Sequence, residues 1–220
     1  MADTQRGAAV QAQGSDVVAP APQQVEPSAV IADPAPLGLA GFAMTTFVLS
    51  WFNAKLISNT TLEAVVLPLA LFYGGLAQFL AGMWEFRKGN TFGALAFTSF
   101  GAFWLSFAAY VKFVAPGLGA NASTATGLFL LVWTIFTAYM TVAAARVNAA
   151  VLAVFVFLTL TFLFLTIGAW APSSTMTQIG GWLGLVTAVV AWYTSLAGVT
   201  NFTWKRNILP VFPLTPAPHR

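Results

Sequence analysis

The sequence contains no cysteine and a single histidine, His219. Without cysteine the chain forms no disulfide and offers no thiolate to a metal. Charged residues make up only 7% of the chain, against about 25% in a typical soluble domain. Hydrophobic residues make up 58%, and the mean hydropathy is +0.79. This composition indicates an integral membrane protein. The net charge of +3 comes from scattered basic residues, which is not a nucleic-acid-binding pattern.

Acidic residues are equally scarce, and none lies in the middle of an apolar block. Glu85 comes closest, beside Arg87 and Lys88, and we expect an ion pair there. A relay of acids and histidines through the membrane is therefore not expected. A nucleophile with a base beside it and a metal-binding constellation are also missing. The sequence thus predicts a protein that is not an enzyme and uses no metal and no cofactor. The six acids are Asp3, Asp16, Glu26, Asp33, Glu63 and Glu85.

Six apolar blocks follow one another, each near the roughly 20 residues that cross a bilayer as a helix. Barrel strands would alternate over about ten residues, whereas these blocks are continuously apolar. The predicted fold class is an all-α integral membrane protein with six transmembrane helices. Residues 146–148 form so short a link that the helices on either side must make a tight antiparallel hairpin. The blocks cover residues 37–57, 64–84, 92–111, 125–145, 149–170 and 180–200.

Polar sequence flanks the blocks at both ends of the chain. Residues 1–32 have no apolar run, so we expect a disordered cytoplasmic tail and not a signal peptide. Residues 33–205 form the predicted transmembrane domain, and residues 206–220 a second cytoplasmic tail. With both termini in the cytoplasm, most flanking basic residues lie inside, as the positive-inside rule favours. We expect a multi-pass protein of the plasma or inner membrane. The inside residues are Arg87, Lys88, Arg146, Lys205 and Arg206, and the outside residues are Lys55 and Lys112.

The first apolar block begins with the stretch DPAPLGLAGF at residues 33–42. Asp33 is a good N-cap, because its carboxylate can accept from free N–H groups of the first turn. Pro34 and Pro36 suit a helix start, where a missing N–H costs little. Gly38 lets another helix or a solute approach the backbone closely. These features predict the start of the first transmembrane helix.

Neutral hydrogen-bonding side chains remain inside the predicted helices. Threonines there commonly bond to their own helix or to a neighbour, whereas the Gln78 amide has four bonding positions to fill. A path without fixed charge suits a small, weakly polar solute. A monocarboxylic acid, with a pKa of about 4–5, crosses an apolar constriction far more easily as the neutral form than as the anion. The proton then travels with the solute. Candidates to line the path are Thr45, Thr46, Tyr73, Gln78, Ser99 and Thr159.

Two other functions fit the same features. An uncharged, threonine-rich path would also pass a neutral amide such as urea. The protein could instead be a membrane scaffold or signalling subunit whose polar tail binds partners. A pH profile of uptake separates acid flux from amide flux. Removal of residues 1–30 separates transport from recruitment, because only a recruiting subunit depends on the tail.

Three stretches resemble the acetate uptake transporter family, also called succinate–acetate permeases. The resemblance runs from about residue 33 to about residue 210, in the family's order and spacing. It implies six transmembrane helices per subunit, a pore within each protomer, a cyclic homohexamer and proton-coupled uptake of acetate and other short monocarboxylates. The stretches are residues 33–42, similar to the family's N-P-A-P-L-G-L signature, FYGGLAQ at 72–78, and KGNTFG at 88–93 with TSFG at 98–101.

The resemblance also implies an apolar belt at the narrowest point of the pore. The family's Phe and Leu correspond to Phe42 and Leu158, and its Tyr corresponds to Phe100, where this sequence departs from the pattern. The three residues lie at depths that agree within about 6 Å, at 1.5 Å of rise per residue. Asp33 replaces the usual Asn, and residues 139–145 lack a Gly-Gly-Thr-like turn seen in some members. The position associated with larger dicarboxylates corresponds to Ala191, so succinate stays a candidate substrate.

Overall fold

The computed structural model describes residues 31–214, so the predicted tail at residues 1–32 falls almost wholly outside the described part of the chain. Across 31–214 the secondary structure is helical, apart from one isolated bridge between Asn148 and Pro213. Six helical segments are long and apolar enough to cross a membrane, which confirms the predicted six-helix fold. The segments are Ala35–Asn53, Thr60–Lys88, Thr91–Gly117, Gly119–Ala144, Ala149–Trp170 and Ser174–Thr203.

The second segment is not one uniform α-helix. A 3₁₀ turn (Thr60–Val65) leads into α2 (Val66–Leu71), a π-helical turn (Phe72–Ala77) and α3 (Gln78–Lys88). A Cβ on Gly74, within the π turn, would lie 2.8 Å from the Cβ of Thr45 and 2.9 Å from the Trp104 ring. The missing side chain therefore lets the wide turn pack directly against two neighbouring helices.

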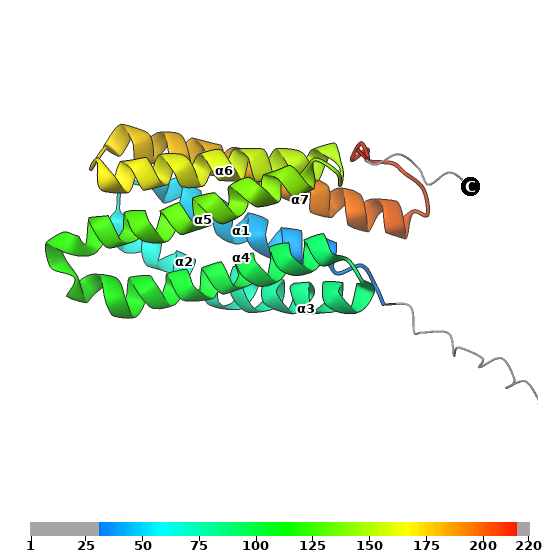
Figure 1. Ribbon diagram of the computed structural model, residues 1–220, viewed down its shortest axis with the longest axis horizontal. Helices are drawn as coiled ribbons and strands as arrows, with labels where there is room; N and C mark the ends of the chain where they lie inside the picture. Colours follow the sequence, from blue (N-terminus) through cyan, green and yellow to red (C-terminus); the bar gives the residue numbers. More distant parts are fainter. Residues whose placement is uncertain (1–30, 215–220) are drawn as a thin grey trace, which may run out of the picture. The chain divides into compact units, whose positions relative to one another are not determined.

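The other segments are simpler. The first is α1 (Ala35–Asn53), and the third combines α4 (Thr91–Ala109) with a π turn and a 3₁₀ turn. The last three contain α5 (Ala122–Ala144), α6 (Ala149–Trp170) and α7 (Ser174–Thr203). The short link between α5 and α6 makes the predicted hairpin, because these two helices pack against each other along their length. Figure 1 shows the helices lying side by side.

Side-chain caps fix several helix starts. The Asn90 Oδ1 accepts from the Gly93 N–H at 3.2 Å, and the Asn148 Oδ1 accepts from the Val151 N–H at 2.8 Å. The start of α1 differs by one residue from the prediction. Its N-cap is Pro34, whose carbonyl accepts from Gly38, while the Asp33 Oδ1 accepts from the Ala35 N–H at 3.0 Å. Each cap satisfies backbone donors that the first helical turn leaves free.

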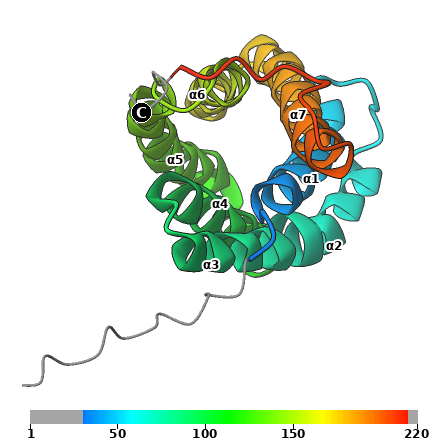
Figure 2. The same cartoon turned by 90° about the vertical axis from the view of Figure 1, so that its right-hand side faces the viewer.

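The helices follow one another around a ring when viewed end-on (Figure 2). α1 packs on α7, α7 on α6 and α6 on α5, while α3 packs on α4 and on α1. Glycines bring backbones together: a Cβ on Gly101 of α4 would lie 2.6 Å from the Phe79 backbone nitrogen of α3. The backbones of α4 and α5 approach each other at only a few positions. Aromatic rings fill the space between them, as where Phe103 meets Trp133 with centroids 5.1 Å apart.

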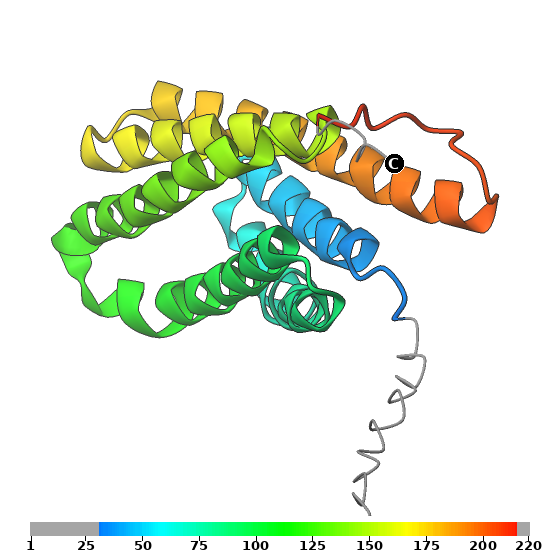
Figure 3. The same ribbon diagram turned by 45° about the vertical axis from the view of Figure 1, so that its right-hand side comes forward.

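The chain returns after α7 to the start of α6. This C-terminal strap, residues 205–214, is visible in Figure 3 as the red segment beyond the end of α7. The Tyr193 hydroxyl donates to the Pro210 carbonyl at 2.7 Å, and the Ala149 N–H donates to the Phe212 carbonyl at 2.9 Å. The described part of the predicted C-terminal tail is therefore bonded to two helices.

Candidate functional site

Two cavities lie end to end within the ring of helices. The inner cavity, of about 290 Å³, is lined by the first halves of α1, α4 and α6 together with residues of α3 and α7. The outer cavity, of about 310 Å³, is lined by the last halves of α1 and α6 and by the segment from α4 to α5. We call the first cavity inner and the second outer, because the flanking basic residues favour the cytoplasm for the end of the molecule at which the first cavity lies.

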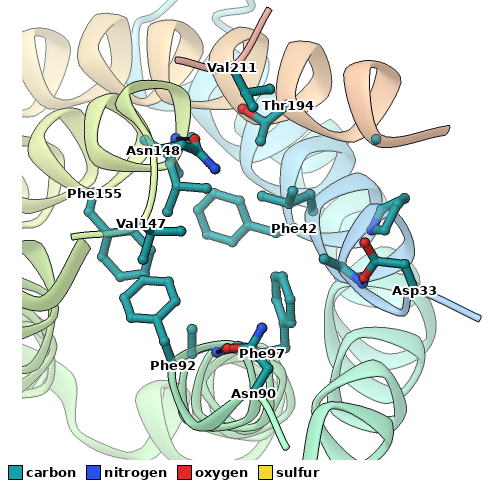
Figure 4. Close-up of a pocket in the computed structure, with 18 of the residues that line it drawn as sticks. Asp33, Phe42, Asn90, Phe92, Phe97, Val147, Asn148, Phe155, Thr194 and Val211 are labelled. Carbon is teal, nitrogen blue, oxygen red and sulfur yellow. Dashed lines mark hydrogen bonds between the residues drawn. The ribbon is translucent and has the colours of Figure 1, made fainter. Parts of the chain in front are cut away.

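The inner cavity lies at the end of the molecule where α1, α4 and α6 begin. Asp33, Asn90 and Asn148, which stand at these three starts, all line it. Figure 4 shows the side chains of Asn90 and Asn148 on different walls of the cavity. Each amide oxygen caps its own helix, and the Asn90 side chain also lies beside the Glu85 carboxyl group. The Lys88 Nζ lies 2.7 Å from the Asp33 Oδ1. The cation of Lys88, at the mouth of the inner cavity where α1 begins, is therefore paired.

The structure brings the three predicted belt residues together between the cavities. Phe42 and Leu158 line both cavities, and Phe100 lines the inner one. The Phe42 and Phe100 rings have centroids 5.7 Å apart. All three side chains are almost fully buried. Their part in limiting passage stays a prediction.

Phe100 stands where the family pattern has Tyr, and its surroundings are aromatic. Besides Phe42, its ring contacts Trp133, Phe136 and Phe155, with centroids 6.1, 5.3 and 6.0 Å away. Edge and tilted ring contacts of this kind are favourable for aromatic pairs. Phe100 therefore also ties α4 to α1, α5 and α6 at the level of the belt.

The six polar candidates divide into two groups. Gln78 lines the inner cavity and Thr46 the outer one, and in each side chain one oxygen lacks a hydrogen-bond partner among the described residues. The other four line neither cavity. Thr45 bonds to the Gly41 carbonyl, and Thr159 bonds to the Phe155 carbonyl and to Thr141 on α5. The four are Thr45, Tyr73, Ser99 and Thr159.

The motif at the start of α1 is divided in the same way. Asp33 and Pro36 line the inner cavity, whereas Pro34 is buried and Gly38 packs under the Phe97 ring. Ala191 on α7 is fully buried and lines neither cavity. Any influence of Ala191 on the size of the substrate would therefore act through the packing of α7.

Glu85 does not make the expected ion pair, because Lys88 pairs with Asp33 instead. The Glu85 side chain is fully buried beside Gly93 at the start of α4, and the Asn90 side chain is its polar neighbour there. Glu85 lines neither cavity. Within the same described range, no group of three His, Cys, Asp or Glu side chains could hold a metal ion.

Sequence reasoning missed several residues of the cavity walls. Asn90 and Asn148 directly precede apolar helices, so N-cap preference could have identified both. Glu63 lines the outer cavity from the 3₁₀ turn before α2. Glu63 lies on a short turn that packs against the helices, and a turn shows no repeating pattern of apolar residues from which the direction of its side chains could be predicted. Phe97, Phe155 and Thr194 also line the inner cavity (Figure 4).

Six membrane-spanning helices around two cavities, with a buried apolar belt between them, define a polytopic membrane protein built like a small-solute transport protein. The chain belongs to the GPR1/FUN34/yaaH family, whose sequence model matches residues 17–216.

Named relatives and a solved structure support this assignment. Acetate permease A of Emericella nidulans is 42% identical over 84% of this chain and 68% of its own length. The succinate-acetate/proton symporter SatP of Escherichia coli K12 is 40% identical over 82% of this chain and 95% of its own length. The structure of the bacterial acetate channel SatP matches with a TM-score of 0.76 and 38% identity, over 83% of this chain and 99% of that one. The chain spans about two thirds of the length of the fungal relatives that it matches.

Proposed function

We propose that this protein transports acetate and other short monocarboxylic acids across the membrane, in effect together with a proton, with succinate as a further candidate. The observation that carries the proposal is the pair of cavities with Phe42 and Leu158 on the walls of both. The belt contains no charged group. The relatives named for acetate permeation and for succinate-acetate/proton symport support the choice of solute.

The chemistry of the belt favours the uncharged acid. Moving an ion into an apolar region costs far more than moving a neutral group of the same size. A carboxylic acid that loses its proton only after the belt carries that proton across, so the protein needs no relay of its own. Gln78 and Thr46 line the two cavities, and their oxygens have no hydrogen-bond partner among the described residues. Both oxygens are buried, so each would bond a carboxyl group only after its side chain turns toward the cavity.

Uptake of labelled acetate into proteoliposomes, with and without an imposed pH gradient, tests the proposal. An acidic outside should drive accumulation, and collapse of the gradient should stop it. Labelled urea serves as the comparison, since flux of a neutral amide should not respond to pH. Urea flux without acetate flux would favour an amide pore, and absence of both would leave the scaffold function.

The assembly and the orientation belong to the same proposal. We expect a homohexamer in the plasma or inner membrane with both termini in the cytoplasm, acting as a transport protein and not as an enzyme. The family resemblance supports the hexamer, and the five inside against two outside basic residues support the orientation. Native mass spectrometry in mild detergent measures the first. Labels at residues 10 and 215, reached only from the cytoplasmic side, would establish the second.

A further inference from the structure

Glu63 is turned toward the outer cavity by the turn on which it lies. The 3₁₀ turn Thr60–Val65 is held at its start by Asn59, whose side chain accepts from the Thr61 N–H at 3.1 Å. Leu62, Ala64 and Val65 are exposed, whereas Glu63 is half-buried and its side chain lines the cavity. The turn therefore presents one carboxyl group to the space outside the belt.

This carboxyl group is the formal charge on the wall of the outer cavity. Of the other acids in residues 31–214, Asp33 is paired with Lys88, and Glu85 is buried away from both cavities. Glu63 itself makes no ion pair within the described part of the chain. Tyr110 also lines the outer cavity, but its hydroxyl is bonded to Thr126 at 2.7 Å and to the Ala122 carbonyl at 3.2 Å.

The two lysines at the outer ends of the helices do not line the cavity. Lys55 directly follows α1, which packs against the 3₁₀ turn, and Lys112 lies on the π turn after α4. Both side chains are exposed, and neither lines the outer cavity. Solvated lysines of this kind are screened over a distance of about 10 Å in ordinary salt.

Helix ends of both signs lie beside the outer cavity. α1 and α6 end there, where Asn53 and Ala169 line the wall, and α5 and α7 begin there, where Thr126 and Thr177 line it. The carbonyl end of a helix carries a partial negative charge, and the N–H end carries a partial positive charge. The partial charges of the helices therefore offset one another, and the Glu63 carboxylate decides the sign of the charge that an anion meets in this cavity.

We propose that Glu63 is a specificity-determining residue that keeps carboxylate anions out of the outer cavity, so that acids come in from this side as neutral molecules. The inference rests on the proposed transport of short carboxylic acids and adds a regulation by external pH. Acidification neutralises the solute and also removes the charge on Glu63. Uptake should therefore rise more steeply toward low pH than the neutral fraction of the solute alone.

The absence of cysteine from the chain permits a direct test of the sign of this charge. Glu63→Cys places a single thiol in the outer cavity, and thiosulfonate reagents then attach a sulfonate or a trimethylammonium group. Where entry into the outer cavity limits uptake, anions admitted there take up a proton before they cross the belt, so we expect Glu63→Gln and unmodified Glu63→Cys to raise initial acetate uptake at external pH 7.5 by about three- to tenfold. At pH 5.5 both should approach the wild-type rate. The sulfonate should lower uptake by Glu63→Cys toward wild type, and the trimethylammonium group should raise it further.

Matched controls separate charge from structure. Lys112→Cys receives the same reagents at the same end of the molecule without facing the cavity, and its uptake should change less than about twofold. Flux of uncharged acetamide should be the same in all forms, since it does not respond to the charge at residue 63. Reduction of the mixed disulfide should restore the starting rate, which shows that the protein stayed folded.

Two results would overturn the inference. One is wild-type acetate transport whose pH profile is unchanged in Glu63→Gln and in both modified forms, in which case the proposed function stands and the role of Glu63 does not. The other is reaction of Glu63→Cys with an impermeant reagent only from the cytoplasmic side of right-side-out vesicles. A wild-type protein that accumulates no acetate under a pH gradient would instead contradict the proposed function.

Discussion

The Lys88 Nζ lies 2.7 Å from the Asp33 Oδ1 and joins the end of α3 to the start of α1 at the mouth of the inner cavity. The pair explains how this chain carries Asp where the family pattern has Asn. The additional negative charge is compensated by a lysine from a neighbouring helix. Because both side chains are well exposed, the pair contributes little to stability, about 0–1 kcal/mol. Its main effect is on the charge that a solute meets at this mouth.

Removing either charge of this pair should change acetate efflux in opposite directions, and removing both should leave it nearly unchanged. Asp33→Asn leaves an unpaired cation at the inner mouth and should increase acetate efflux from the inner side at pH 7 by about two- to threefold. Lys88→Gln leaves an unpaired carboxylate and should decrease it by a similar factor. The double variant should return near the wild-type rate. Changes of the same sign in both single variants would show that the charge at this mouth is not what counts.

Phe100→Tyr should restore the hydroxyl of the family pattern. Phe42, Trp133, Phe136 and Phe155 surround the ring and Phe100 lines the inner cavity, so we expect the new hydroxyl to meet a solute in that cavity. One neutral hydrogen bond to a passing carboxyl group is worth about 0.5–1.5 kcal/mol. We expect uptake at neutral pH to rise by up to about tenfold and its pH dependence to flatten. Initial rates from pH 5 to 8, at matched membrane abundance, provide the measurement.

Leu158→Ala should widen the opening between the cavities, because Leu158 lines both. Loss of the branched side chain removes contacts that exclude bulkier acids, and we expect the ratio of succinate to acetate uptake to rise by about tenfold. Leu165→Ala is a matched control: Leu165 lines the outer cavity on the same helix, two turns from the belt. An equal change of selectivity in both variants would mean that the belt is not the size filter.

Gly101→Ala should separate α3 from α4. Its Cβ would lie 2.6 Å from the Phe79 backbone nitrogen and 2.7 Å from the Phe79 Cα, and neither atom can move without its helix. Crowding of this kind costs about 1–3 kcal/mol, and we expect a lower melting temperature in detergent. Gly117→Ala is the control, since a Cβ there would meet nothing within 4 Å. Unchanged melting of Gly101→Ala would show that these helices tolerate a wider spacing.

The number and order of the helices could be predicted from the sequence because each block is apolar throughout its length. The residues at which the helices begin and end were harder to predict. α7 begins at Ser174, six residues before the predicted block, since Ser173 caps a first turn that is too polar to be recognised by hydropathy. The π turn at Phe72–Ala77 depends on contacts of Gly74 with Thr45 and Trp104 from other helices, which no local pattern displays.

The types of residue that line the candidate site could be predicted from the sequence, but the directions in which their side chains face could not. Gln78 and Thr159 were both candidates for the path, yet Gln78 lines the inner cavity while Thr159 faces Thr141 on α5. A helix that is apolar all round gives no signal of which side faces a neighbour. The same limitation hid Glu63, whose direction is set by a turn packed at the end of α1 and not by its own neighbours in sequence.

The wall that Phe42 and Leu158 share between the two cavities has an electrical consequence. Where aqueous solution fills a cavity on each side, the membrane voltage falls across the thin partition between them. A monovalent anion crossing there experiences nearly the whole voltage, about 2.3 kcal/mol for each 100 mV, over the thickness of a side chain. A neutral acid experiences none of it. In a cell that is negative inside, uptake through this partition should therefore follow the proton gradient and be indifferent to membrane potential.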